Sequence, residues 1–207
     1  MLCICLHCVV QAGGTALVQA TSSRQADAVK WLIERGADIN AATDGGRGPL
    51  HIAAEAGQQD LLQLLLAQGD KAQLNMQDRN GYAPLHLAAQ AGQPDSCSAL
   101  LEAGADVNLK AHEDKALGVE TALMIAVRKL QPANRDRGLR KAMPRVVAVL
   151  LEGGADTEPR GPMGDTVLDQ ARSLRGTPEG KAVYDLLEDA MLSSDSDVSN
   201  SSSDSDS

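Results

Sequence analysis

The sequence predicts an all-α fold, a solenoid of stacked helix-turn-helix units joined by short hairpin loops. Three observations carry this prediction. A unit of nearly constant length recurs along the chain, hydrophobic residues make up 43% of it, and Phe is absent while aromatic residues are only 1%. Small Ala and Leu side chains must therefore fill the core, which suits closely stacked short helices better than packed sheets.

The repeat is marked by its first Leu and its closing Gly. The first Leu recurs at Leu17, Leu50, Leu85, Leu123 and Leu168, and the closing Gly at Gly36, Gly69, Gly104 and Gly154. The interval from Leu to Gly is 19 residues in the first three units and 31 in the fourth, whereas the interval from Gly to the next Leu varies from 14 to 19. A constant unit with variable connectors indicates a rigid helical pair joined by adjustable loops.

In the third unit, GYAPLHLAAQAGQ, each framework residue has a local role. Pro84 begins a helix at a position where its missing N–H costs nothing. Ala88 and Ala89 are small enough for a neighbouring helix to approach closely. Gly92 is expected to end the helix in the left-handed conformation.

The segments GYAPLHLAAQAG and LLEAGADVN resemble the ankyrin repeat, whose mark is Thr-Pro-Leu-His-x-Ala at a period of about 33 residues. The resemblance covers about residues 13–190 in five repeats, of which the second and third are close matches. In the other three repeats the His is replaced by Val18, Met124 and Asp169. The resemblance implies an ankyrin-repeat solenoid and leaves the partner open.

We expect three regions. Residues 1–12 form an apolar, Cys-rich N-terminal segment, and residues 13–192 form the repeat domain, with an insert at 128–145. Residues 193–207 are expected to be a disordered acidic tail, because Ser and Asp dominate them and they have almost no apolar side chain to bury.

Net charge and cysteine positions limit the classes of ligand and the cellular compartments to be expected. A formal net charge of -9 disfavours nucleic-acid binding, which depends on neutralising phosphates. Cys3, Cys5 and Cys8 lie too close together for a disulfide framework, so we expect a reducing compartment, the cytoplasm or nucleus. We also expect the protein to be a monomer. The cluster leaves three interpretations open. It binds zinc with His7, it is acylated at Cys3 or Cys5 and meets a membrane, or, as we favour, it is the remnant of an earlier repeat.

The sequence predicts no catalytic, metal or cofactor site. His51 and His86 occupy the same position in successive repeats, and a catalytic or metal-binding pair would hardly be built by repetition. The resemblance implies that this His ties loop backbone to its neighbour. The sequence also contains no HExxH motif, glycine-rich phosphate loop or nucleophile–base arrangement.

We therefore predict a non-catalytic protein-binding module, acting as an adaptor, scaffold or inhibitor. The resemblance places partner contacts on the hairpin tips and the inner-helix face. The candidate residues there are Arg47, Glu55, Arg79, Tyr82, Gln90, Glu120, Arg128 and Asp165. Tyr82 is expected to be an exposed aromatic anchor. One alternative is that these residues are simply solvated. Another is that the chain is a targeting or regulatory fragment of a larger enzyme or membrane-associated protein.

The insert at 128–145 is expected to be a basic loop, since it holds seven of the chain's 19 basic residues. Its residues Arg135, Arg137, Arg140, Lys141 and Arg145 are a candidate site for an anion or an acidic partner. The alternative is a solvated loop with no ligand.

Two modifications are predicted from local patterns. Ser194, Ser201 and Ser203 each precede an Asp by three residues, as in sites of acidophilic kinases. One hypothesis is that the phosphorylated tail folds back on the basic insert, and the alternative is that both segments stay solvated and independent. Asn40 and Asn108 resemble the hairpin Asn that is hydroxylated in many ankyrin proteins. The alternatives are a plain solubilising tail and an Asn chosen for turn hydrogen bonding.

Overall fold

The computed structural model describes residues 16–69, 71–112, 119–131, 134, 136–158 and 164–196. Within these ranges it contains ten α-helices, one 3-10 helix and two short strands. The elements are α1 (Ala16–Ser22), α2 (Ala26–Glu34), α3 (Pro49–Glu55), α4 (Gln59–Gln68), η1 (Lys71–Asn75), α5 (Pro84–Ala91), α6 (Pro94–Glu102), β1 (Ala111–His112), β2 (Val119–Glu120), α7 (Ala122–Lys129), α8 (Arg137–Glu152), α9 (Val167–Ser173) and α10 (Pro178–Ser196).

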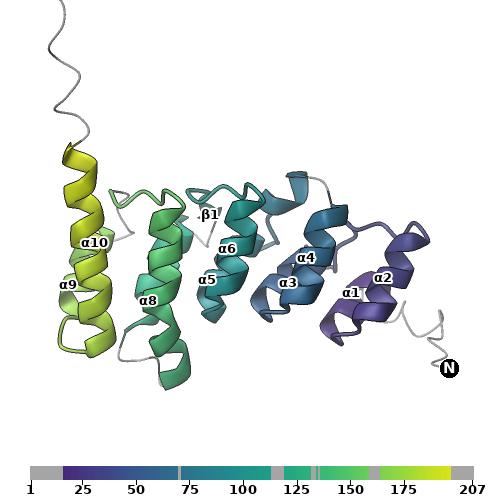
Figure 1. The fold of residues 1–207 in the computed structure, drawn as a ribbon, viewed down its shortest axis with the longest axis horizontal. Helices are drawn as coiled ribbons and strands as arrows, with labels where there is room; N and C mark the ends of the chain where they lie inside the picture. The colour runs from purple at the N-terminus through teal and green to yellow at the C-terminus, as the bar shows by residue number, and fades with distance from the viewer. Residues whose placement is uncertain are drawn as a thin grey trace, which may run out of the picture.

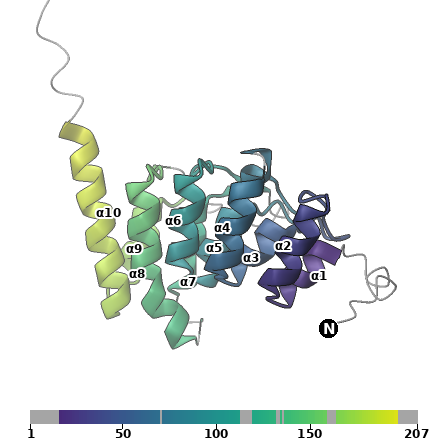
Figure 2. The same cartoon turned by 45° about the vertical axis from the view of Figure 1, so that its right-hand side comes forward.

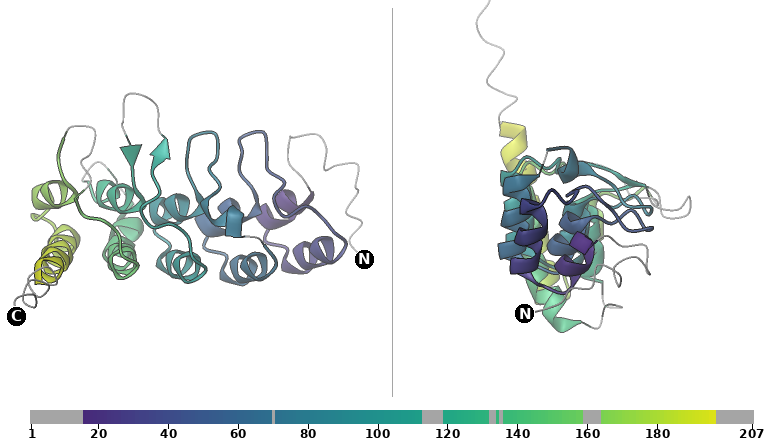
Figure 3. Two further views of the ribbon diagram at one scale, coloured as in Figure 1. Left: turned by 90° about the horizontal axis from the view of Figure 1, so that it is seen from above. Right: turned by 90° about the vertical axis from the view of Figure 1, so that its right-hand side faces the viewer.

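The helices form five antiparallel pairs that stack side by side in chain order (Figure 1). The odd-numbered helices make an inner row and the even-numbered helices an outer row, with the connecting hairpins projecting beyond the inner row (Figure 3). Each inner helix contacts the next inner helix, and each outer helix packs on its neighbours in the same way. The predicted all-α solenoid of helix pairs is confirmed.

The variable connectors differ in local structure. After the second pair, the connector contains the 3-10 helix η1. After the third pair, the longest connector carries β1 and β2, which pair antiparallel with Ala111 opposite Glu120 and His112 opposite Val119. These two-residue strands are the only strands in the part of the chain that the structure describes.

One hydrophobic core runs through all five pairs. The first Leu of the second, third and fourth repeats is buried in it, as is Leu65 of the outer row. The paired alanines of the inner helices, Ala53, Ala54, Ala88 and Ala89, are completely buried, which confirms that they let neighbouring helices approach closely. Because each repeat buries its apolar face against the next, the stack is stabilised by contacts between neighbours.

The structure corrects the prediction that the insert at 128–145 is a loop. Helix α8 begins at Arg137 and continues without a break to Glu152. Pro144 occupies the position equivalent to Pro94, the first residue of α6, so the extra residues add about two turns before the usual start of the outer helix. These turns extend α8 past the adjacent outer helices (Figure 2).

The added turns of α8 pack on the third repeat. Gly92 ends α5 with φ 70°, as the sequence predicted, and a Cβ there would overlap Leu139 and Met143 of α8. Met143 is fully buried. The insert is therefore a fixed helical extension, because its apolar side chains fill the space that this glycine leaves open.

The C-terminal boundary also differs from the expectation. Helix α10 extends to Ser196, four residues beyond the predicted end of the repeat domain at 192. The rest of the predicted tail, residues 197–207, lies outside the described residues, as does the N-terminal segment 1–12.

Candidate protein-binding face

His51 and His86 connect backbone groups across the repeats. The Nδ1 atom of His51 accepts from the backbone N–H of Gly48 at 3.2 Å, and its Nε2 lies 3.2 Å from the carbonyl oxygen of Tyr82 in the next repeat. His86 does the same with Ala83 N–H at 3.1 Å and the carbonyl of Leu109 at 2.9 Å. Each ring thus caps the start of its own helix and is hydrogen-bonded to a backbone carbonyl of the hairpin that follows.

These contacts require neutral imidazole rings. Nδ1 faces an N–H donor in both cases and must carry a lone pair, so the proton is on Nε2 and is donated to the carbonyl. Burial lowers the pKa of His51 and of His86 below the ordinary value, which favours the same neutral form. Both residues are therefore structural in the role that the sequence analysis expected.

The fourth and fifth repeats lack this His and start their inner helices differently. Thr121 Oγ1 accepts from Met124 N, and Thr166 Oγ1 accepts from Asp169 N at 3.2 Å. Asp169 returns a bond by accepting from Thr166 N. The third position of the helix can change because the hydroxyl before the helix takes over the capping hydrogen bond.

The described residues contain no cluster of three or more His, Cys, Asp or Glu side chains that could hold a metal ion. Cys97 is buried in α6, and burial raises the pKa of its thiol to about 12. A thiol with such a pKa carries almost no thiolate at neutral pH and is a poor nucleophile.

Within one repeat, the last part of the hairpin before the inner helix lies next to the C-terminal end of that helix. In the second and fourth repeats these two positions carry opposite charges. Arg47 Nη1 lies 2.9 Å from Glu55 Oε2, and Arg128 Nη2 lies 2.8 Å from Glu120 Oε2. The two positions are eight residues apart in both repeats, but the cation and the anion have exchanged places. In the third repeat the equivalent residues are uncharged, Tyr82 and Gln90.

We call these three pairs of equivalent positions the variable face. Arg47 and Glu55 are about two-fifths exposed, at 35% and 43%, so they are paired with each other and still reachable from solvent. Glu120 is different, because its side chain is only 6% exposed while that of Arg128 is 33% exposed. Four of the predicted partner-binding residues therefore form two internal ion pairs.

The prediction that Tyr82 is an exposed anchor is wrong. Tyr82 is 8% exposed and belongs to a small apolar cluster with Leu87, Ala111 and Ile125. Ala111 comes from β1, so the first strand of the connector after the third repeat contributes to this cluster. Tyr82 is buried in this cluster with Ala111, at the start of the connector; the length of that connector was visible in the sequence although the position of Ala111 was not.

Three other predicted partner-binding residues lie at the surface. Arg79 is exposed at the tip of the hairpin that follows η1, and Gln90 and Asp165 are half-exposed. Gln90 lies between the two ion pairs in repeat order, since it belongs to the third repeat. It is the accessible centre of the variable face.

Asp78 is a structural residue that the sequence analysis missed. Its buried carboxylate accepts from the backbone N–H groups of Asn80 and Tyr82 through Oδ1, and from Arg47 Nε through Oδ2 at 3.1 Å. Arg47 thus joins its own repeat to the next hairpin. The signal available in the sequence was an Asp at the base of a turn, which is a common residue there for this hydrogen-bonding reason.

The basic residues of the insert have separate environments. Arg137, Lys141 and Arg145 are exposed on α8, Arg140 is half-buried, and Arg135 lies outside the described residues. Arg145 Nη2 is 3.7 Å from Asp95 Oδ1, and both side chains are about three-quarters exposed.

The two Asn residues predicted to be hydroxylated are exposed but differ in bonding. Asn108 Oδ1 accepts from Asp156 N at 2.8 Å, and its amide group donates to Gly154 O at 3.3 Å. The side chain of Asn40 makes no hydrogen bond within the described residues, whereas its backbone N–H donates to Asp38. Asn75, at the equivalent position of the second repeat, accepts from Asp106 N.

The predicted phosphorylation sites are mostly beyond the described part of the chain. Ser194 lies in the last turns of α10, and Ser201, Ser203, Cys3, Cys5 and Cys8 are outside the described residues. Helices α8 and α10 pack side by side and run in the same direction, so α10 ends on the side of the stack where α8 ends and opposite to where α8 begins (Figures 1 and 2). The predicted fold-back would have to return along α8, about 24 Å at 1.5 Å per residue.

Comparison with known proteins agrees with this architecture. The family model described as ankyrin repeats in three copies matches residues 17–111. None of the helices in the described ranges is long and apolar enough to cross a membrane.

Three curated relatives are similar to part of the chain. Myotrophin of Xenopus tropicalis is 42% identical over 57 residues, which are 28% of this chain and 48% of that protein. Myotrophin of Xenopus laevis is 39% identical over 49 residues, 24% of this chain and 42% of that protein. Ankyrin repeat and SOCS box protein 14 of Homo sapiens is 34% identical over 67 residues, 32% of this chain and 11% of that protein.

The chain spans less than half the length of each of these relatives. The family match ends at residue 111, and the same stacking of helix pairs continues through α7–α8 and α9–α10. The repeat signature, the family match and the stacked helix pairs identify residues 17–111 as ankyrin repeats.

Proposed function

We propose that this protein is an adaptor or scaffold that binds another protein through the variable face of repeats two to four, without catalysing a reaction. Ankyrin repeats are protein-interaction modules, and the match over residues 17–111 supports that general role. The choice of this face rests on a comparison between the repeats themselves.

The observation that carries the proposal is a constant frame with changing side chains on it. The second and third repeats share Pro, Leu and His at the start of the inner helix and the same Ala pair in its middle. At the hairpin end and the helix end, in contrast, Arg47 and Glu55 are replaced by Tyr82 and Gln90, and then by Glu120 and Arg128. Such a pattern is typical of a repeat scaffold that presents different residues to one partner.

The ion pairs favour binding because they hold long side chains in place. A flexible Arg or Glu loses rotamer freedom when a partner immobilises it, at a cost of about 0.5–1.5 kcal/mol per side chain. Arg47 is already held by Glu55 and Asp78, and Arg128 by Glu120, so part of that cost is met before a partner arrives. Each pair still has an exposed side on which charged groups of the partner can act.

Site-specific photo-cross-linking tests this proposal. A photoreactive residue in place of Gln90 probes the centre of the variable face, and the same residue in place of Glu102, an exposed position on the outer helix α6, is the matched control. We expect a discrete covalent adduct from position 90 in cell extract and none from position 102. Equal adducts from both positions, or adducts from position 102 alone, contradict the proposed face.

A further inference from the structure

We propose a second interaction surface, a ridge of three basic residues on α8 that binds an extended acidic segment of another protein, with acidic groups at every second residue. The ridge consists of Arg137, Lys141 and Arg145. It lies on the outer row of helices, whereas the variable face lies on the inner row and the hairpins, so it goes beyond the function proposed above (Figure 3).

The ridge follows from helical geometry. Residues four apart in an α-helix lie on the same side, one turn above the other. All three ridge residues are exposed, while Met143, Val146, Val147 and Leu150 on the opposite side of α8 are fully buried. The three cations therefore point away from the core in a row about 12 Å long, at 1.5 Å rise per residue.

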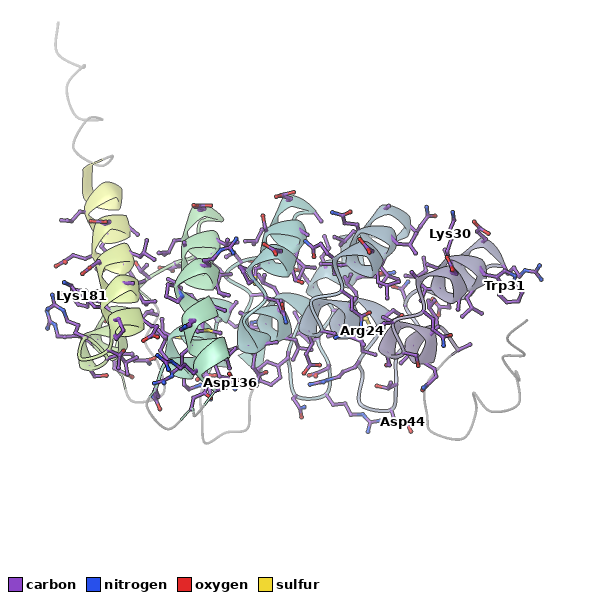
Figure 4. All side chains as sticks on the ribbon, turned by 60° about the horizontal axis from the view of Figure 1, so that its bottom comes forward. Arg24, Lys30, Trp31, Asp44, Asp136 and Lys181 are labelled. Carbon is purple, nitrogen blue, oxygen red and sulfur yellow. The ribbon has the colours of Figure 1, made fainter. Side chains whose placement is uncertain are left out.

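The row is held in a fixed place. The first turns of α8 are anchored by Asp136, whose Oδ1 accepts from Leu139 N at 3.0 Å, and by the packing of Leu139 and Met143 beside Gly92. Asp136 lies at the start of α8 (Figure 4). The basic residues thus form a built surface on a rigid element, unlike residues of a flexible loop.

The charges of the ridge are largely unused within the protein. Arg137 and Lys141 have no ion-pair partner among the described residues. Arg145 has one, the carboxylate of Asp95 at 3.7 Å, with side chains 76% and 77% exposed. An ion pair this exposed contributes little, so a carboxylate from a partner can replace Asp95.

The spacing selects the partner. Neighbouring cations of the ridge are about 6 Å apart along the helix axis. In an extended peptide, side chains at every second residue point the same way and are about 6.6–6.8 Å apart. A segment of the form acidic-x-acidic-x-acidic therefore places three carboxylates or phosphates opposite the three cations, with a mismatch of about 1 Å that long side chains absorb.

The partner is assigned to another protein and not to the chain's own C-terminal residues. The sequence Asp204-Ser205-Asp206 has the required alternation. Helix α10, however, ends on the side of the stack opposite to the start of α8 (Figure 1). To reach the start of α8, the residues after Ser196 would have to stay nearly fully extended along about 24 Å of that helix, a constraint that does not apply to a segment of another protein.

Two synthetic peptides of the same composition test the spacing in the full chain: Ser-Asp-Ser-Asp-Ser-Asp-Ser and Asp-Asp-Asp-Ser-Ser-Ser-Ser, each labelled for fluorescence anisotropy at low salt. We expect the alternating peptide to bind several-fold more tightly. The variant Arg137→Gln/Lys141→Gln/Arg145→Gln should lose roughly tenfold in affinity, because three weak charge contacts are removed. Its matched control, Arg24→Gln/Lys30→Gln/Lys110→Gln, removes the same charge from exposed residues elsewhere and should change the affinity less than about twofold.

One substitution should act in the opposite direction. Asp95→Asn frees Arg145 while leaving the ridge intact, and we expect the alternating peptide to bind about two- to fivefold more tightly. Equal binding of the two peptides would make the ridge a non-specific anion surface and overturn the proposal. If Asp204→Asn/Asp206→Asn raises the peptide affinity as much as Asp95→Asn does, the chain's own C-terminal residues occupy the ridge, which overturns the assignment to another protein.

Discussion

Arg128 donates to Glu120 Oε2 at 2.8 Å, and this ion pair is the charge-exchanged counterpart of Arg47 and Glu55 in the second repeat. The two pairs differ in burial, since the carboxylate side chain is 6% exposed in the fourth repeat and 43% exposed in the second. The two ion pairs therefore contribute differently to the stability of the protein although their geometry is the same. A buried carboxylate depends on its cation far more than a half-exposed one does.

Replacing Arg128 by Gln should destabilise the protein by about 1–3 kcal/mol, because Glu120 loses its cation inside the protein. Replacing Glu55 by Gln should cost less than about 1 kcal/mol, since that carboxylate is half-exposed and Arg47 keeps Asp78. Urea unfolding of the two variants measures both values. Equal costs at the two positions would show that burial does not decide the strength of these pairs.

Leu85→Ala should cost about 2–5 kcal/mol, because Leu85 is buried in the central stack and its loss leaves a cavity. Leu192→Ala is the control, since Leu192 is 66% exposed and should change the stability very little. The shift of the urea midpoint reports both. An unchanged midpoint for Leu85→Ala would refute the packing at this position.

Stability should fall on acidification below about pH 6.5, the ordinary pKa of His. Burial lowers the pKa of His51 and His86 in the folded state, so the unfolded chain binds more protons in this range. Their contribution is complete above pH 6.5 and decreases as the pH falls towards the lower pKa of the folded protein. Denaturant unfolding between pH 5 and 7.5 should show a smaller slope for His51→Gln/His86→Gln than for the unmodified protein. An identical slope would mean that neither ring is held neutral.

If the hairpin asparagines are hydroxylated, Asn40 should be modified more than Asn108. An enzyme that acts on Asn108 must first break the bonds from Asp156 N and to Gly154 O, whereas no such bond holds the Asn40 side chain in the described structure. Peptide mass spectrometry of protein from cells, scored for one added oxygen on each residue, provides the comparison. Preferential modification of Asn108 would show that these bonds do not protect it.

The framework could be predicted from the sequence because it depends on short-range patterns. Pro84 and Gly92 determine the ends of α5, and the His position of α5 recurs in α3, so local rules were sufficient for the inner helices. Two further patterns in the sequence carry structural information that the prediction did not use. The opposite charges eight residues apart in repeats two and four indicate an internal pair, and Pro144 in register with Pro94 indicates a helix extended at its start.

The exposure of Tyr82 could not be predicted, since it depends on a segment far along the chain. Its ring is covered because Ala111 of β1 packs on Leu87 and Ile125 of the inner row. The length of that connector shows only that something projects from the third repeat, and the direction in which it folds is decided by tertiary packing. The role of Arg47 was obscured in the same way, because its second partner, Asp78, lies 31 residues away.

Hydrogen–deuterium exchange of the protein, alone and with the partner captured through position 90, tests the variable face most directly. The account predicts slower exchange in the hairpin ends around Arg47 and Tyr82 and at the ends of α3, α5 and α7, with no change in the outer helices α2 and α4. Protection confined to the outer helices, with the hairpin ends and inner-helix ends unchanged, would contradict it.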